Sequence, residues 1–310
     1  MTIMNGAYIN GLDNATINLE TVKEAVNTAT TDYILFSLTV QDTMTGDIYY
    51  GLNKNIVATK GSMTFTGIEI LAPVVTAGAI KGACSKVWLS LGGAGDGNVR
   101  NETFTNIQTI LANGGTAATH LLNNLAVLAK KLKALSSRIT SVGFDLDNED
   151  ASISAVVPLV VALYKHGISQ SPQVQYPFTF CAYGNDTEWF DALGGVYSGL
   201  GVQPVVGITL QTYSGGGRNY PPTWTSDLAE YLKDPGNQPT GLSSAEGFIL
   251  PIQSMDDATY PIYSPSQMTS NLETWQSTGG SFWATQALFQ SSPPQKWSDY
   301  ASAIASGISS

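Results

Sequence analysis

The chain has 310 residues and a formal net charge of −10, with 24 acidic residues against 14 basic ones. Because it also has no run rich in Lys or Arg, this balance argues against nucleic acid or an anionic membrane as a partner. Charged residues make up only 12% of the chain and aromatic residues 10%, a composition that suits an uncharged partner such as a sugar. We expect one domain over residues 1–310, because α/β barrels reach this length around a single core.

The two cysteines, Cys84 and Cys181, lie far apart in the sequence. We expect two buried thiols, with one disulfide as the alternative, and no metal site built on them. The first residues contain neither a basic region nor a long apolar run, so no signal peptide is expected in this chain. The longest apolar run, near residues 153–164, is too short to cross a membrane and predicts a buried helix.

Short apolar segments alternate with helical patterns along the whole chain. The eight expected strands cover residues 6–10, 33–39, 86–91, 139–150, 178–182, 204–212, 247–253 and 280–285. Expected helices cover residues 19–28, 68–81, 116–138, 152–165, 187–197, 225–233, 266–277 and 295–308. Residues 47–50 and 62–65 are expected to form a hairpin or a long loop. Strands and helices that alternate in this way predict an α/β fold, a closed parallel (β/α)8 TIM barrel.

The stretch 139–150 contains carboxylates at alternate positions. Read as a strand, it places Gly143, Asp145, Asp147 and Glu149 on one face. Each carboxylate raises the pKa of the next, a cost that is tolerated where the groups share protons, as a catalytic acid requires. The alternative is an acidic loop that faces water or holds a cation. Asp150, on the opposite face, is expected to cap a helix.

In a barrel of this kind the active site lies at the C-terminal ends of the strands. Unusual residues follow several of the expected strands. They are Gly92 and Gly93 in a glycine cluster that extends to Gly95, then Glu149, Tyr183, Gln211, Tyr213 and Trp283. The glycines predict tight turning and close backbone approach. From the residues alone, Trp283 fits the core as well as a sugar platform, and Tyr213 could simply end a strand.

Four motifs at these positions resemble those of glycoside hydrolase family 18, the family of chitinases and endo-β-N-acetylglucosaminidases. The family's strand-four signature, Asp-Gly-x-Asp-x-Asp-x-Glu, is matched from Gly143 to Glu149, with Val142 in place of the first Asp. Residues 90–93 match Ser-x-Gly-Gly on strand three, residues 211–213 match Gln-x-Tyr after strand six, and residues 279–283 resemble Gly-Gly-x-x-x-Trp on strand eight. The resemblance spans the whole barrel.

The resemblance implies a hydrolysis that is assisted by the 2-acetamido group of the substrate itself. Glu149 would be the general acid, Asp147 would orient the acetamide N–H group, and Asp145 would share a proton with Asp147. Tyr213 would hydrogen-bond the acetamide oxygen and Trp283 would form the apolar floor under the sugar. Further sugar contacts are expected from Gln211, Tyr183 and Tyr8. This chemistry needs no cofactor and no metal.

The predicted function is that of a monomeric chitinase that cuts β-1,4 linkages between N-acetylglucosamine units. Aromatic-rich loops at residues 220–224 and 260–263 favour it. One alternative is an endo-β-N-acetylglucosaminidase that acts on the chitobiose core of N-glycans with the same acid. Another, of a different class, is a non-catalytic lectin or inhibitor, which Val142 keeps open, although we expect activity to survive this replacement with a changed pH optimum. Family and composition suggest a secreted protein, with the cytoplasm as the alternative.

Overall fold

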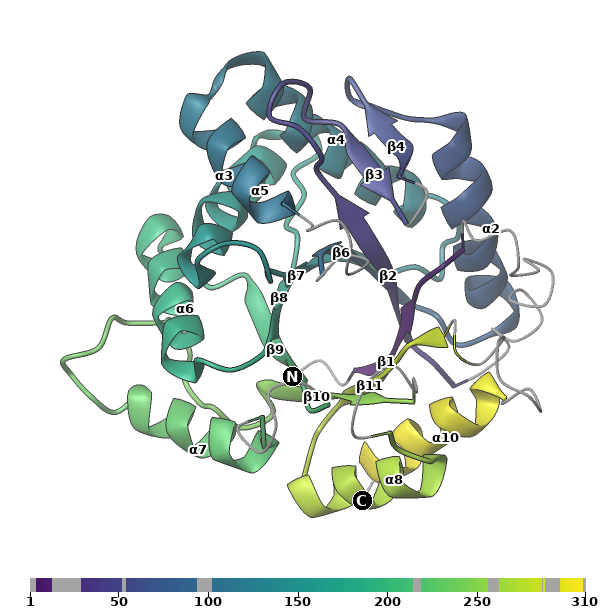
Figure 1. Cartoon of the computed structure of the whole chain (residues 1–310), viewed down its shortest axis with the longest axis vertical. Helices are drawn as coiled ribbons and strands as arrows, with labels where there is room; N and C mark the ends of the chain where they lie inside the picture. Colours follow the sequence, from purple (N-terminus) through teal and green to yellow (C-terminus); the bar gives the residue numbers. More distant parts are fainter. Residues whose placement is uncertain are drawn as a thin grey trace.

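The computed structural model describes residues 4–12, 29–51, 54–93, 102–213, 219–255, 262–285, 287 and 296–308. Within these ranges, eight parallel strands form a closed barrel with helices around it (Figure 1). Neighbouring strands follow the order β1-β11-β10-β9-β8-β7-β6-β2, and β1 also pairs with β2, which closes the sheet. The structure therefore confirms the predicted (β/α)8 TIM barrel.

The barrel strands are short and mostly buried. Their bounds are β1 (Asn5–Ile9), β2 (Asp32–Thr39), β6 (Lys86–Gly92), β7 (Ser141–Asp147), β8 (Phe178–Ala182), β9 (Val205–Gln211), β10 (Ile249–Ser254) and β11 (Gly280–Trp283). Strands that are covered on both faces read as nearly continuous apolar runs, which is why all eight could be predicted from the sequence. One prediction needs correction, because β7 ends at Asp147 and Glu149 therefore lies after the strand.

Helices pack on the outside of the barrel (Figure 1). They are α2 (Phe65–Lys81), α3 (Thr103–Asn113), α4 (Gly115–Lys133), α5 (Val156–Ser169), α6 (Asp186–Leu200), α7 (Pro221–Tyr231), α8 (Pro265–Trp275) and α10 (Trp297–Ile308), with a short 3-10 helix η1 (Ile153–Ala155) before α5. The sequence did not predict α3, and the helix predicted over 116–138 ends at Lys133. The helix predicted over 19–28 lies outside the described residues. None of the helices in the described ranges is both long and apolar enough to cross a membrane.

An antiparallel extension follows β2. It consists of β3 (Ile48–Tyr50), β4 (Asn55–Thr59) and β5 (Ser62–Met63), each paired with the strand before it. The predicted hairpin is thus present, with β4 as an additional strand. The next helix, α2, begins at a cap in which the Thr64 hydroxyl accepts from the backbone N–H of Gly67 at 3.0 Å.

Two hydrophobic clusters fill the molecule. The larger one lies between the barrel and its helices, where α4 contributes four fully buried leucines at helical spacing, Leu121, Leu125, Leu128 and Leu132. Burying each such side chain stabilises the fold by about 1.5–3 kcal/mol. The smaller cluster has a different membership, Met4, Tyr8, Ile34, Trp88, Cys181, Leu250 and Ile252, with Phe36, Tyr213 and Trp283 packed against it.

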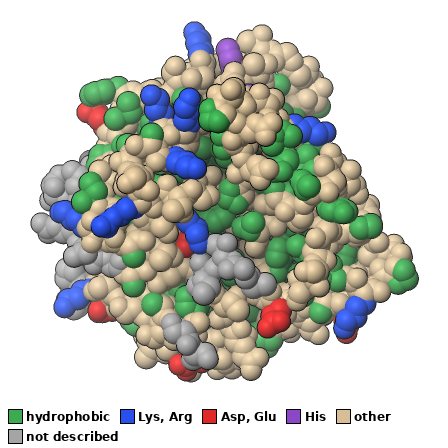
Figure 2. All heavy atoms as spheres, turned by 180° about the vertical axis from the view of Figure 1, so that it is seen from behind, with side chains coloured by type: hydrophobic (Ala, Val, Ile, Leu, Met, Phe, Trp, Pro, Cys, Tyr) green, Lys and Arg blue, Asp and Glu red, His purple; other side chains and the backbone are tan. Residues whose placement is uncertain are grey.

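Both cysteines are free and buried, as predicted, and they belong to different clusters. Cys84 lies in the larger cluster and Cys181 in the smaller one. Val142, which replaces the first Asp of the signature, is also part of the larger cluster. On the surface, uncharged side chains make up most of the face shown in Figure 2, in keeping with the 12% of charged residues.

Candidate active site

The carboxylates of β7 occupy the C-terminal half of the strand, in register with polar residues of both neighbouring strands. Asp145 lies opposite Ser90 of β6 and Thr179 of β8, and Asp147 lies opposite Gly92 of β6. Asp145 is 0% exposed and Asp147 is 4% exposed. This register brings hydroxyl groups against the first carboxylate and the backbone of a glycine against the second.

Four hydroxyl groups surround the Asp145 carboxylate. Its Oδ1 atom accepts from Thr179 at 2.7 Å and from Thr209 at 2.9 Å. Its Oδ2 atom accepts from Ser90 at 2.8 Å and from Tyr8 at 3.1 Å. Burial raises the pKa of Asp145, and these four hydrogen bonds act in the opposite direction. Since a carboxylate offers about four acceptor sites, this shell of donors fills them all.

Asp147, Glu149 and Gln211 form a second network. The Gln211 amide nitrogen donates to Asp147 Oδ1 at 3.1 Å and to Glu149 Oε1 at 3.3 Å. The Asp147 and Glu149 side chains also hydrogen-bond to each other. Because an ionised carboxylate is only an acceptor, that bond requires a proton on one of the two groups. The predicted proton sharing between Asp145 and Asp147 stays a prediction, and Glu149 is a second partner with which Asp147 can share a proton.

The pKa values of this pair are raised for identifiable reasons. Burial raises the pKa of Asp147 well above its usual value, and the charges of Glu149 and Asp145 raise it further. Desolvation also raises the pKa of Glu149, against hydrogen bonds from Gln211 and Asp147 that lower it. Glu149 itself reaches the surface of the site, so a bound substrate can contact it. The pair therefore holds a proton more readily than two exposed carboxylates would, and its outer member, Glu149, is accessible.

Aromatic side chains surround the carboxylates at the mouth of the barrel. The Trp283 ring packs edge-on against Phe36 at 4.6 Å between centroids and against Tyr8 at 5.7 Å. The Tyr213 ring lies nearly parallel to Trp283, with 6.5 Å between centroids and 20° between planes. Phe36, Tyr213 and Trp283 are only partly buried. Burial raises the pKa of Tyr213 well above its usual value, so its hydroxyl group stays protonated and can donate.

The glycine motif after β6 makes the close backbone approach that the sequence predicted. Gly92 and Gly93 have φ angles of +103° and +95°, a region that side chains disfavour. A Cβ atom on Gly92 would collide with the Asp147 carbonyl oxygen, and one on Gly93 would collide with the Phe36 ring. The Gly93 N–H group donates to the same Asp147 carbonyl oxygen at 2.8 Å. The remainder of the predicted glycine cluster lies outside the described residues.

Two residues with predicted sugar contacts differ in exposure. Tyr8 is 1% exposed and its hydroxyl group donates to Asp145, whereas Tyr183, directly after β8, is 46% exposed, and its sugar contact stays a prediction. Trp224, in one of the aromatic-rich loops, is a buried core residue of α7, whereas part of the second loop is not described. Asp150 does cap a helix, because its carboxylate accepts from the backbone N–H groups of Phe104 and Thr105 at the start of α3.

The sequence analysis missed four contributors to the site, Phe36, Thr179, Cys181 and Thr209. A signal for three of them was present, since Thr179 and Cys181 alternate with two Phe residues in β8, and Thr209 shares a strand face with Gln211 in β9. Among the described residues, no group of three or more His, Cys, Asp or Glu side chains could hold a metal ion.

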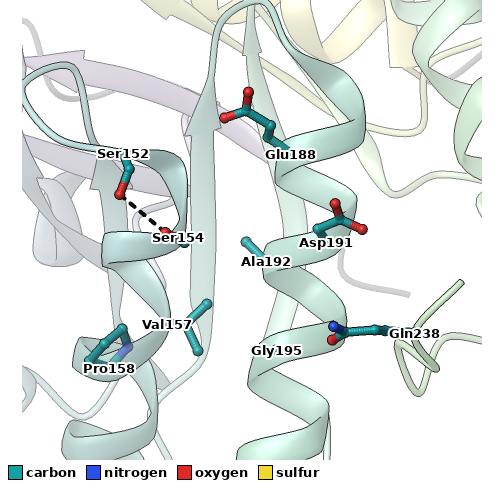
Figure 3. Close-up of a pocket in the computed structure, with 9 residues that line it drawn as sticks. All are labelled: Ser152, Ser154, Val157, Pro158, Glu188, Asp191, Ala192, Gly195 and Gln238. Atoms are coloured by element: carbon teal, nitrogen blue, oxygen red, sulfur yellow. Dashed lines mark hydrogen bonds between the residues drawn. The ribbon is translucent and has the colours of Figure 1, made fainter.

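A cavity of about 530 Å³ opens at a different place, on the outside of the barrel between α5 and α6 (Figure 3). It is lined by Ser152, Ser154, Val157, Pro158, Glu188, Asp191, Ala192, Gly195 and Gln238. None of the carboxylates of the two networks above lines it. Its acidic residues, Glu188 and Asp191, both come from α6, so it is distinct from the candidate active site.

Comparisons with known proteins identify the fold. No family model and no curated protein matches the sequence. A chitinase-like agglutinin from Robinia pseudoacacia matches in structure with a TM-score of 0.60 at 10% identity, over 98% of this chain and 99% of that one. A family GH18 chitinase from Cycas revoluta, solved with allosamidin, matches with a TM-score of 0.55 at 11% identity, over 95% and 98% of the two chains. This chain has the fold of the family 18 chitinases.

A third structure with this fold was solved with chito-oligosaccharides bound to it. The active domain 2 of a thermostable chitinase from Pyrococcus furiosus, solved with chito-oligosaccharides, matches with a TM-score of 0.55 at 12% identity, over 99% of this chain and 96% of that chain. Enzymes and an agglutinin thus share one architecture with this chain. The chemistry of the site has to decide between hydrolysis and binding.

Proposed function

We propose that this chain is a retaining glycoside hydrolase that cleaves β-1,4 linkages between N-acetylglucosamine units, as in chitin or chito-oligosaccharides. The observation that supports it best is the hydrogen-bonded Asp147–Glu149 pair at the barrel mouth. A general acid has to hold a proton at working pH and still reach its substrate. The desolvated and accessible Glu149 carboxyl group meets both conditions.

In the proposed reaction, Glu149 gives its proton to the glycosidic oxygen while the bond between that oxygen and C1 breaks. The carbonyl oxygen of the substrate's 2-acetamido group forms a bond to C1, which gives an oxazolinium ion. Asp147 accepts a hydrogen bond from the acetamide N–H group and stabilises the positive charge. Water then attacks C1 while Glu149 takes a proton from it and the bond between C1 and the acetamide oxygen breaks, so the acetamido group is restored and the product keeps the configuration of the substrate.

The aromatic residues fit the remaining roles. Tyr213 keeps its proton and can donate to the acetamide oxygen, which positions that oxygen for attack. Trp283, partly buried among Tyr8, Phe36 and Tyr213, offers an apolar face on which the C–H surface of a sugar can stack. All of these groups come from one chain, so we propose that a monomer is active. We also propose an extracellular location, because a polymeric substrate of this kind does not enter cells.

A second candidate is a barrel that binds sugar without cutting it. The structural match to the Robinia pseudoacacia agglutinin favours it. The neighbouring Asp147 and Glu149 carboxyl groups, whose pKa values burial raises, argue against it, because binding alone does not need a general acid. The endo-β-N-acetylglucosaminidase alternative uses the same residues and differs only in the substrate.

Product analysis separates these functions. The parent protein, Glu149→Gln and the control Glu188→Gln, which changes an acid in the cavity between α5 and α6, are incubated with a chito-oligosaccharide and with a high-mannose glycoprotein. We expect the parent and the control to cut the oligosaccharide, and Glu149→Gln to be slower by about 10²–10⁴-fold. Release of glycan from the glycoprotein would move the assignment to the endoglycosidase. Equal sugar binding by all three proteins without any cleavage would show a lectin.

A further inference from the structure

The proposed general acid lies just outside the sheet. β7 ends at Asp147, so the hydrogen bonds between strands do not fix the backbone of Glu149. The Glu149 side chain is exposed, and the hydrogen bond that its carboxyl group accepts from Gln211 is 3.3 Å long. Its position relative to the barrel therefore depends on how the residues on either side of it are held.

Asn148, directly before Glu149, closes the turn that carries the acid. Its Oδ1 atom accepts from the backbone N–H group of Ala151 at 3.1 Å, and its Nδ2 atom donates to the carbonyl oxygen of Ser152 at 2.9 Å. Asn148 is 6% exposed, so little water competes for these bonds. They give the turn its shape, but they join it to no other element of the fold.

Asp150, directly after Glu149, joins the turn to helix α3. The first N–H groups of a helix have no partner within that helix, and Glu102, at the N-cap of α3, makes no side-chain cap hydrogen bond. The Asp150 carboxylate caps the helix instead. Its Oδ1 atom accepts from the backbone N–H group of Phe104 at 3.1 Å, and its Oδ2 atom accepts from that of Thr105 at 2.9 Å. The positive end of the helix dipole adds to the attraction.

The start of α3 is itself fixed to the barrel. Phe104 is 0% exposed, and its ring packs so closely on Gly92, the last residue of β6, that a Cβ atom there would lie 2.8 Å from it. The Thr103 hydroxyl group accepts from the backbone N–H group of Val40 at 3.2 Å, and the Asn106 amide group donates to the Val40 carbonyl oxygen at 2.9 Å. A group bound to this helix start is therefore held relative to β2 and β6.

We propose that Asp150 is a positioning residue for the general acid. By binding the start of α3 it anchors the turn after β7, and this anchor keeps the Glu149 carboxyl group beside Asp147 and Gln211 at the mouth of the barrel. This inference rests on the proposed function and deepens it, because it adds a residue beyond Glu149, where the family signature ends. The alternative is that Asp150 stabilises α3 and has no effect on the reaction.

The kinetics of three variants separate these two roles. Asp150→Ala removes both acceptors, Asp150→Asn keeps one, and the control Thr64→Ala removes the cap of a different helix, α2. We expect Asp150→Ala to lower kcat by about 10–10²-fold with little change in KM, because a small displacement of a reacting group slows the chemical step while the sugar contacts on other strands remain. Asp150→Asn should recover most of this loss, since Asn caps helices about as well as Asp.

The control variant shows what the loss of a helix cap does by itself. Thr64→Ala should lower the melting temperature as Asp150→Ala does, and it should leave kcat unchanged. An equal kcat in Asp150→Ala and Thr64→Ala would overturn the proposal. A kcat of Asp150→Asn as low as that of Asp150→Ala would overturn it as well, because the lost charge and not the lost anchor would then be the cause.

The pH profile gives a readout that a loss of stability alone does not move. Among the described residues, the titratable groups that interact with Glu149, beside the neighbouring Asp150 itself, are Asp147 on β7 and Tyr213 after β9. Desolvation is the main cause that raises the pKa of Glu149, so a turn released into water should lower that pKa. The alkaline limb of kcat, where the acid loses its proton, should then move to lower pH in Asp150→Ala. Asp150→Asn should keep the limb of the parent, and a limb that stays in place in Asp150→Ala would contradict the proposal.

A titration without substrate distinguishes failure of this inference from failure of the proposed function. The ¹³C carboxyl signal of Glu149, assigned with Glu149→Gln, is followed in the free protein. We expect a lower midpoint in Asp150→Ala than in the parent, Asp150→Asn and Thr64→Ala. Equal midpoints in all four proteins would refute the role of Asp150, whether or not the protein cuts sugar. A lower midpoint in Asp150→Ala together with a parent that cuts no sugar would support the anchor and refute the proposed function.

Discussion

The shell of hydroxyl groups around Asp145 predicts how a single threonine contributes to stability. Thr179→Val replaces the hydroxyl group that donates to Asp145 Oδ1 at 2.7 Å with a methyl group of similar size. Thr179 is 0% exposed, and valine has nearly the same shape as threonine but lacks the hydroxyl group. The change therefore isolates one hydrogen bond to a carboxylate.

A buried hydrogen bond to a charged group contributes about 1.5–3 kcal/mol, against about 0.5–1.5 kcal/mol for a bond between neutral groups. Above its pKa, Asp145 is charged, so we expect Thr179→Val to lower the free energy of unfolding by an amount in the higher range. The variant also raises the pKa of Asp145 beyond the value that burial already gives it. As the pH falls through these values the carboxyl group is protonated in both proteins, and the difference in stability shrinks.

Urea unfolding of the parent and of Thr179→Val, at several values from about pH 8 to about pH 4.5, measures this difference. Thr212→Val is the control, because the Thr212 hydroxyl group donates to the neutral carbonyl oxygen of Ile252 at 2.7 Å. Its cost should be the same at every pH. If Thr179→Val instead costs only about 0.5–1.5 kcal/mol at every pH, Asp145 is neutral throughout and the assignment of its four donors to a carboxylate is wrong.

Three further predictions concern the rest of the site. Because burial raises the pKa values of Asp147 and Glu149, these groups bind more protons in the folded state, and stability should fall as the pH rises from about 4 through their folded pKa values. Asp147→Asn should flatten this dependence and stabilise the protein by about 1–2 kcal/mol at neutral pH, measured by thermal unfolding. Gly93→Ala, at a φ angle of +95°, should lower stability by about 1–3 kcal/mol and displace the Phe36 ring from Trp283, visible in tryptophan fluorescence. Both thiols are buried, and burial raises the pKa of Cys84 to about 12. Neither thiol should therefore react with a thiol reagent in the native protein, and both should react after unfolding. A thiol that reacts in the native protein would contradict the buried position of that cysteine.

The barrel could be predicted because its strands are covered on both faces and therefore stand out as apolar runs. Helix α3 was missed since its sequence, TFTNIQTILAN, is rich in Thr and Asn, which have low helix propensity. Its start is stabilised by Asp150, a residue 45 and 46 positions away from the N–H groups that it caps. No local pattern can contain a contact of that kind.

The residues of the candidate site also fall into those that the sequence predicts and those that it does not. Asp145 and Asp147 could be predicted because they lie on one strand, where period two assigns them the same face. Gln211 could be predicted because it belongs to a short motif at the end of another strand. The hydrogen bond from Tyr8 to Asp145 could not be predicted, because it joins β1 to β7, two strands that are not neighbours in the sheet. Period two gives the strand faces of Cys181 and Thr209, but only the register between β8 and β9 sets these two residues opposite each other.

The central claim is that the substrate's own acetamido group takes part in hydrolysis with Glu149 as the acid. It is tested most directly by comparing the rates at which the parent protein cuts two β-1,4 oligomers of equal length, one of N-acetylglucosamine and one of glucose. We predict cleavage of the acetylated oligomer alone, with retained configuration in the product and loss of the reaction in Glu149→Gln. Comparable cleavage of the glucose oligomer, or a product of inverted configuration, would contradict it.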